Sequence, residues 1–167
     1  KVCAFKVASG DFTFYPLIKE LFHYKKPIFI STGMATQSEI INFVNNFKKE
    51  IKNFKKPFCL MYCISDYPAK KENVNLNSIR FLSRYCDFAG YSDHTLGIDS
   101  AVESIYFGAR IIEKHFTLNK KLIGPDHMAS ITPNELNKLV KNIRNVEKIL
   151  GKDMKKPYDK ELKNLKF

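Results

Sequence analysis

Short apolar runs recur along the chain, and each one ends in polar residues. They are AFKVASGD from Ala4, PIFISTG from Pro27, FCLMYCIS from Phe58, FAGYSDHT from Phe88 and RIIEKHFT from Arg110. Each run is too short for a helix and too continuously apolar for a half-exposed strand, which is typical of buried parallel strands. The pattern therefore predicts five parallel strands.

Helical patterns with clear start signals lie between these runs. Thr36 and Glu39 have the spacing of a capping box, as do Thr132 and Glu135, where Pro133 takes the first helical position. We expect the first helix to bury Ile40, Ile41, Phe43, Val44 and Phe47. We expect the last helix to end at Gly151 and to bury Leu136, Leu139, Val140, Ile143, Val146 and Leu150. A third helix is predicted over residues 98–109, with Ala101, Val102, Ile105 and Phe107 facing inward.

Alternation of strands and helices is typical of a doubly wound sheet or a TIM (β/α)8 barrel. Both folds place function at the carboxyl ends of the strands. Polar residues follow the strand in all five units, which favours the barrel, and neither GxGxxG after the first strand nor GxxxxGK[ST] occurs. We therefore expect an α/β fold, a partial TIM barrel of about five βα units over residues 1–151. The charged segment 152–167 is predicted to be a linker or a surface helix.

Composition narrows the class of protein further. No apolar run approaches the roughly 20 residues of a membrane span. The net charge of +11 comes mainly from scattered lysines without an aromatic-basic motif, so we expect no nucleic-acid partner. The four cysteines form no CxxC pair, which predicts reduced, mostly buried thiols and a cytoplasmic protein.

Two histidines end consecutive predicted strands. His94 and His115 would lie side by side if those strands pair in parallel. Two neutral imidazoles with open coordination positions suit a divalent metal that acts as a Lewis acid. Asp93 and Glu113 could fix the imidazole tautomers. From the residues alone, packed or solvated strand-end histidines remain the alternative.

A second group of polar residues could bind an anion. It comprises Lys6, Ser9, Gly10, Ser31, Thr32, Gly33 and Ser92. Lysine, hydroxyls and glycine-permitted backbone N–H groups at adjoining strand ends are what a phosphate needs. The alternative is that the hydroxyls cap helices and the glycines make turns. Asp11 and Asp126 are carboxylates in predicted loops, where turn formation is the alternative role.

Longer strings resemble consecutive blocks of the sialic acid synthase family. They are KVASGD with YPLI, KPIFISTGMAT, YCISDYPA, DFAGYSDHTLGIDSAV, GARIIEKHFTLNK and GPDHMASITPNEL, in order from about Lys1 to Gly151. The combination of YSDHT, EKHFT and GPDH is far more specific than any one motif. The tail ELKNLKF resembles the family's linker to a C-terminal antifreeze-protein-like domain.

The resemblance implies an enzyme that condenses phosphoenolpyruvate with N-acetylmannosamine or a 2,4-diacetamido-trideoxyhexose. It implies a divalent metal, manganese with magnesium as the alternative, held by His94 and His115. Lys6, Ser9, Ser31 and Ser92 match the family's phosphoenolpyruvate-binding residues. The resemblance also implies catalytic roles for Asp11, Lys6, His94 and His115, with Asp11 handling water or a sugar hydroxyl. Sugar-binding positions match Ser65, Tyr67 and Asp126, although Ser65 stands where some members carry Asn.

The family's opening block, an EIGxNHNG-like strand, and its next two strands have no counterpart in the sequence. We therefore expect the C-terminal part of a barrel, poorly stable and inactive by itself, and a homodimer for the full-length protein. Two rival hypotheses remain. One is another metal-dependent phosphoenolpyruvate or pyruvate barrel, including a Schiff-base aldolase at Lys114, which strand alternation would turn away from His115. The other is an inactive fragment that binds a sugar.

Overall fold

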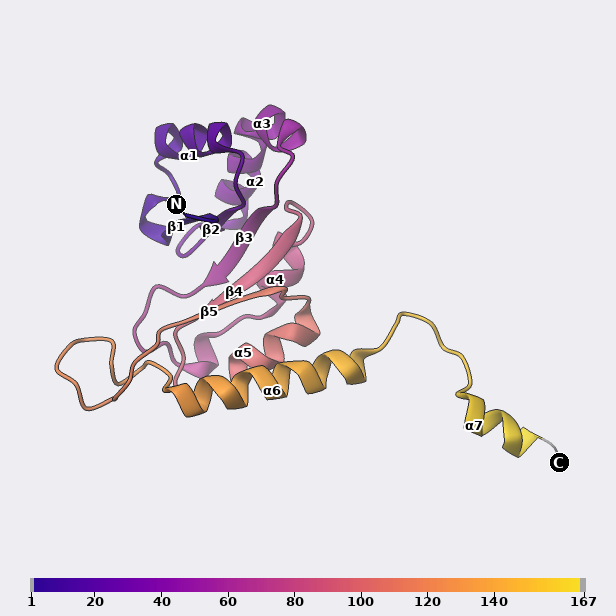
Figure 1. The fold of residues 1–167 in the computed structure, drawn as a ribbon. Coiled ribbons are helices and arrows are strands. Elements are labelled where there is room, and N and C mark those ends of the chain that lie inside the picture. Colours follow the sequence, from indigo (N-terminus) through magenta and orange to yellow (C-terminus); the bar gives the residue numbers. More distant parts are fainter. Residues whose placement is uncertain (1, 166–167) are drawn as a thin grey trace.

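Five parallel strands form one sheet in the sequential order β1-β2-β3-β4-β5 (Figure 1). The structure is a computed structural model that describes residues 2–165. The strands are β1 Phe5–Val7, β2 Ile28–Ser31, β3 Phe58–Cys63, β4 Phe88–Asp93 and β5 Ile111–Lys114. An unreversed order is that of a (β/α)8 barrel, since the order of a doubly wound sheet reverses at a switch point. The five predicted strands are confirmed, and polar residues stand at or just beyond the carboxyl end of each.

Helices follow the strands and cover one face of the sheet. The α-helices are α1 Tyr15–Leu21, α2 Gln37–Asn46, α3 Lys48–Asn53, α4 Asn77–Leu82, α5 Asp99–Glu103, α6 Pro133–Leu150 and α7 Asp159–Leu162. Short 3-10 helices are η1 Ser9–Asp11, η2 Phe22–Tyr24, η3 Lys71–Asn73, η4 Ser104–Phe107 and η5 Lys163–Leu165.

Both predicted capping boxes are confirmed. At the start of α2, the Thr36 hydroxyl accepts the Glu39 N–H, and the Glu39 carboxylate accepts the Thr36 N–H at 2.7 Å. Thr132 and Glu135 repeat this exchange at the start of α6, with a 2.8 Å bond from the Thr132 N–H. Each box satisfies backbone donors that a helix start leaves free, which explains why the two helices begin where the spacing predicts.

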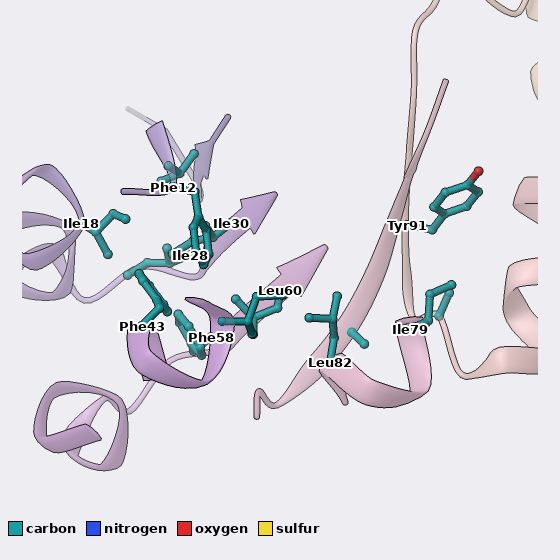
Figure 2. Close-up of a cluster of buried hydrophobic side chains, with 14 of the residues drawn as sticks. Phe12, Ile18, Ile28, Ile30, Phe43, Phe58, Leu60, Ile79, Leu82 and Tyr91 are labelled. Atoms are coloured by element: carbon teal, nitrogen blue, oxygen red, sulfur yellow. The ribbon is translucent and has the colours of Figure 1, made fainter. Parts of the chain in front are cut away.

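The hydrophobic core lies between the sheet and its helices (Figure 2). Alternate strand residues point toward the helices, since side chains alternate across a strand. Ile30, Leu60 and Tyr91 therefore pack in one cluster with Phe43 of α2 and Ile79 of α4. The other strand face is left to line the site.

The predicted helix over residues 98–109 is wrong in its second half. Helix α5 ends at Glu103, and η4 continues to Phe107 before Gly108 adopts a left-handed φ of 95°. The buried Ser104 hydroxyl donates to the Ala101 carbonyl at 2.7 Å. Such a local bond competes with the regular helical pattern and accounts for the tighter turn. Of the expected inward residues, Ala101 and Ile105 are buried, whereas Val102 and Phe107 are half-buried.

Two other sequence predictions need correction. Leu139 and Val146 of the α6 stripe are buried, but Leu136, Val140 and Leu150 are exposed. Helix α6 contacts α5 and η4, so only the side of α6 turned toward them is covered. Cys59 and Cys63 are buried as expected, whereas Cys3 is exposed because it precedes β1 outside the core.

The segment after α6 is exposed from residue 151 to residue 164 and extends away from the sheet (Figure 1). It holds no regular structure until α7, which continues into η5. The predicted linker over 152–167 has its last two residues outside the described part of the chain. Among residues 2–165, no helix combines the length and apolar character that membrane crossing requires.

Candidate active site at the carboxyl ends of the strands

A cavity of about 180 Å³ opens on the face of the sheet that the helices leave free. All five strands contribute to it, because the strand register brings their inward-facing residues together. Ser31 pairs with Met61, Cys63 with Ser92, and Ser92 with Glu113. The complete lining is Lys6, Ala8, Ser9, Ser31, Cys63, Tyr67, Ser92, His94, Glu113 and His115.

His94 and His115 lie next to each other, as the sequence predicts. Their ring centroids are 5.4 Å apart. The register explains the proximity, because Asp93 pairs with Lys114 and each histidine follows directly in the chain. The Tyr67 ring packs against both imidazoles, 4.2 Å from the centroid of His94 and 5.5 Å from that of His115.

The hydrogen bonds of His94 define its tautomer. Its Nδ1 lies against the Ile64 carbonyl, which can only accept, so Nδ1 carries the proton. Burial lowers the pKa of His94, which keeps the imidazole neutral, and the positive charge of a protonated His115 would lower it further. Nε2 lies 3.3 Å from the Ser92 hydroxyl, but that hydroxyl donates its proton to Glu113 at 2.6 Å. The Nε2 lone pair is therefore free to face a ligand.

Glu113 and Asp93 do not fix the imidazole tautomers, contrary to the sequence prediction. Glu113 accepts the Ser92 hydroxyl and pairs with the Lys6 ammonium at 3.3 Å. It thereby joins strands β5, β4 and β1 across the cavity. Asp93 points to the opposite face of the sheet and pairs with Lys114, because strand residues alternate. The tautomer of His94 is set instead by the backbone of Ile64.

Of the predicted anion-binding residues, the cavity lining includes Lys6, Ser9, Ser31 and Ser92, but not Gly10, Thr32 or Gly33. Ser31 is 3% exposed, and its hydroxyl has no hydrogen-bond partner within residues 2–165. The Lys6 side chain remains 32% exposed, so its ammonium can reach a ligand. The Ser9 hydroxyl lies 3.2 Å from the hydroxyl of Ser65. A buried hydroxyl without a partner is costly by itself, which makes Ser31 a strong candidate for contact with a bound group.

Asp11 and Asp126 are at the margin of the site, and neither lines the cavity. Asp11 is exposed in the 3-10 turn after β1. Asp126 is half-buried in the loop between β5 and α6, where its carbonyl accepts the Ser130 N–H and hydroxyl. Partial burial raises the pKa of the Tyr67 hydroxyl, and the negative charges of Asp126 and Glu113 add to that effect.

Cys63 lines the cavity, although the sequence predicts only a structural thiol for it. The thiol is 2% exposed, and burial raises its pKa, so the neutral thiol prevails. The signal was present in the FCLMYCIS run, since strand alternation puts Cys63 on the face opposite Leu60.

The residues at the cavity fit a catalytic metal better than a structural one. Residues 2–165 hold no group of three or more His, Cys, Asp or Glu side chains arranged for a metal ion. A structural zinc site needs about four such ligands. Two adjacent imidazoles, one with an uncommitted Nε2, supply an incomplete donor set that leaves positions for a substrate.

Comparison with known proteins finds a matching family model and several similar chains. The model of the NeuB family matches residues 1–155. Protein MJ1065 of Methanocaldococcus jannaschii is 47% identical over 96% of the chain and 47% of its own length. N,N'-diacetyllegionaminic acid synthase of Legionella pneumophila is 41% identical over 94% of the chain and 45% of its own length.

A solved structure shares the fold closely. It is the N-acetylneuraminic acid synthetase of Leptospira borgpetersenii in complex with citrate, with a TM-score of 0.88 and 37% identity. The match covers 98% of the chain and 56% of the Leptospira chain. The present chain spans about half the length of the curated relatives it matches. The expected partial barrel is thereby confirmed.

Proposed function

The chain belongs to the NeuB family, and on that premise we propose that it forms the substrate site of a phosphoenolpyruvate-dependent nonulosonic acid synthase. The second substrate is an N-acylated hexosamine, and the products are a nine-carbon acid and phosphate. The observation that carries the proposal is the cavity in which the imidazoles of His94 and His115 stand beside Lys6 and the buried hydroxyls of Ser31 and Ser92.

Phosphoenolpyruvate would bind on the Lys6 side of the cavity. The ammonium of Lys6 would balance its negative charge, and the hydroxyls of Ser9 and Ser31 would donate to its oxygens. Ser92 would join them by turning its proton away from Glu113, to which it donates in the structure. The unpartnered Ser31 hydroxyl supports this assignment most strongly. Since Lys6 pairs with Glu113 in the structure, the anion would compete with that carboxylate for the ammonium.

His94 and His115 would hold a divalent ion, for which we propose manganese with magnesium as the alternative. The neutral state of His94 and its free Nε2 support this role. A bound divalent ion supplies Lewis acidity toward the sugar aldehyde. Tyr67 packs against both rings and would restrict their rotation.

The proposed reaction joins the two substrates by a new C–C bond. The C3 carbon of phosphoenolpyruvate attacks the aldehyde carbon of the open-chain sugar, and C2 gains oxocarbenium character. Water adds at C2, and the tetrahedral intermediate expels phosphate with cleavage of the C2–O bond. Lys6 and the serines would stabilise the departing phosphate. Asp11 is our candidate to orient or deprotonate the water, from its position in the turn beside Ser9.

The sugar would bind next to phosphoenolpyruvate, near Ser65, Tyr67 and Asp126. Tyr67 faces the cavity, and the hydroxyl of Ser65 reaches that of Ser9. The name of the Legionella relative favours a diacetamido sugar, so that sugar is the first to test. We further propose that the full-length protein is a homodimer.

One rival function loses its support. A Schiff-base aldolase would need a free lysine amine in the cavity, but Lys114 is 3% exposed and paired with Asp93 on the other face of the sheet. Another metal-dependent phosphoenolpyruvate or pyruvate barrel, and a sugar-binding chain without turnover, are the outcomes that the experiment must separate.

The test is phosphate release from phosphoenolpyruvate by the full-length gene product. The reaction should contain Mn²⁺ and either N-acetylmannosamine or the 2,4-diacetamido-trideoxyhexose, with a His94→Ala variant as control. We expect release that requires metal, sugar and His94. A folded protein that binds Mn²⁺ but releases no phosphate with either sugar would contradict the proposal and favour one of the rivals.

A further inference from the structure

We infer that the buried ion pair of Lys114 and Asp93 positions the histidine pair, an inference that rests on the metal-holding role proposed above. Asp93 directly precedes His94 on β4, and Lys114 directly precedes His115 on β5. The two charged residues are register partners, and the Lys114 Nζ lies 2.9 Å from Asp93 Oδ2. Their side chains are 3% and 0% exposed.

Lys114 also holds the backbone on both sides of His94. Its ammonium donates to the carbonyl of Thr95 and, at 3.4 Å, to the carbonyl of Asp93. One side chain of β5 therefore fixes two peptide groups of the neighbouring chain segment. The imidazole of His94 points the other way, into the cavity. Its direction depends on the peptide groups that Lys114 binds.

The carboxylate of Asp93 completes this arrangement. Its Oδ1 accepts the N–H of Thr95 at 2.8 Å and the hydroxyl of Tyr91 at 3.1 Å. The carbonyl of His94 accepts the N–H of Ala69 at 2.9 Å. These bonds hold the backbone immediately after β4, where the regular hydrogen bonds between strands have ended. Together they leave the His94 backbone little freedom to rotate.

Stability alone does not explain a buried pair at this place. Lys114 lines a groove together with apolar residues that include Ile112, Phe116 and Ile131. Removing two charges from water costs about as much as their attraction returns, so the attraction between the two charges adds little net stability. The geometry of the pair explains its presence better, because the pair joins β4 to β5 directly before the two histidines.

The test compares changes at the two ends of β4 in the full-length gene product. Asp93→Asn combined with Lys114→Met removes both charges, leaves neither one buried alone and abolishes the bonds to the carbonyls. Asp87→Ala is the matched control, because Asp87 accepts the Phe58 N–H at 2.8 Å and ties β4 to β3 far from the histidines. The single variant Lys114→Met leaves the buried Asp93 carboxylate without its partner and serves only as a comparison for folding.

The first readout is the Kd for Mn²⁺, measured by calorimetry with the metal alone. We expect the double variant to melt cooperatively and to bind Mn²⁺ about 10- to 100-fold more weakly, the usual loss when the support of a metal ligand is removed. Asp87→Ala should lower the melting temperature and leave the Kd unchanged. A folded double variant with the parental Kd would overturn the inference.

The second readout needs neither metal nor activity. The Nδ1 proton of His94, bonded to the Ile64 carbonyl, should exchange slowly in the parent and give a resolved resonance in protein with ¹⁵N-labelled histidine. We expect faster exchange in the double variant and no change in Asp87→Ala. If the parent binds no Mn²⁺, the proposed function fails. The exchange rate of the His94 Nδ1 proton then still tests whether the ion pair positions His94. Equal exchange in parent and double variant would refute it, as would a double variant that loses all cooperative folding.

Discussion

Gly33 lies so close to Ser9 that a β-carbon on Gly33 would stand 2.3 Å from the β-carbon of Ser9. Gly33 also has a left-handed φ of 47°, which favours glycine. The absence of a side chain lets the turn after β2 approach the turn after β1. This contact places the Ser9 hydroxyl within reach of Ser65 and keeps it in the lining of the cavity.

We predict that Gly33→Ala displaces Ser9 and weakens the binding of phosphoenolpyruvate. The KM for phosphoenolpyruvate should rise, while the KM for the sugar should change less. Stability should fall by about 1–2 kcal/mol from the left-handed backbone, with any cost of the clash in addition. Steady-state kinetics and urea unfolding of the full-length gene product measure both effects.

Gly108→Ala provides the control for backbone strain. Gly108 has a φ of 95°, but a β-carbon there would meet nothing within 4 Å. The Gly108→Ala variant should lose about as much stability as the backbone strain costs in Gly33→Ala, and it should keep the parental KM for phosphoenolpyruvate. Equal KM changes in both variants would show that the contact between Gly33 and Ser9 has no special role.

Ser31→Ala should weaken phosphoenolpyruvate binding without destabilising the protein. The hydroxyl is buried and unpartnered in residues 2–165, so its removal takes away an uncompensated polar group. A lost bond to a charged ligand is worth about 1.5–3 kcal/mol, which corresponds to a rise in KM of about 10- to 100-fold.

Thr95→Val is the matched control for Ser31→Ala. The Thr95 hydroxyl is also buried and without a partner in the described chain, but Thr95 does not line the cavity. Both variants should keep or gain stability, and only Ser31→Ala should raise the KM. A Ser31→Ala enzyme with the parental KM would place the phosphate elsewhere.

Much of the fold could be predicted because it depends on short-range patterns. The apolar runs identify all five strands, and the spacing of Thr36 to Glu39 fixes the start of α2. The histidine pair could be predicted for a related reason. Consecutive parallel strands are neighbours in this fold, so strand-end residues such as His94 and His115 meet without further information.

The remaining features depend on contacts between distant segments. Glu113 binds Ser92 and Lys6 from two other strands, and no local pattern distinguishes this from a bond to an imidazole. The outward direction of Asp93 is different, because strand alternation contains that information once His94 is assigned to the cavity, although we expected Asp93 to contact an imidazole. The exposure of Val140 on α6 depends on which neighbours cover that helix, which periodicity does not reveal.

Glu135 should contribute stability that is lost in acid. Its bond with the Lys120 ammonium at 2.6 Å, together with the bonds from Thr132, lowers the pKa of Glu135 to about 2. A lowered pKa stabilises the folded state above the unfolded pKa near 4.5, and the contribution disappears as the pH falls toward 2. Glu135→Gln can keep the capping box but loses the charge that pairs with Lys120, so it should cost up to about 1 kcal/mol at pH 7, the usual value of a partly exposed ion pair.

Urea unfolding of Glu135→Gln and its parent at pH 7 and pH 3 measures this difference. The difference in unfolding free energy between the two proteins should be smaller at pH 3 than at pH 7. Glu147→Gln, which breaks an exposed pair with Arg144 within α6, should show a smaller gap at pH 7. A constant gap for Glu135→Gln at both pH values would show that its charge does not matter.

Glu113→Gln should make the cavity bind anions more tightly. In the parent, Glu113 competes with an anion for Lys6, because the two side chains pair at 3.3 Å. Glutamine can still accept the Ser92 hydroxyl but carries no charge, so the ammonium becomes available to a phosphate. The pair is partly exposed, and such pairs are worth up to about 1 kcal/mol, so inorganic phosphate should inhibit up to about fivefold more strongly. The gain should shrink at high salt, where the charges are screened. Glu147→Gln changes the net charge equally at a remote exposed position and should leave phosphate inhibition unchanged. If both variants bound phosphate equally more tightly, overall charge rather than the freed Lys6 would be responsible.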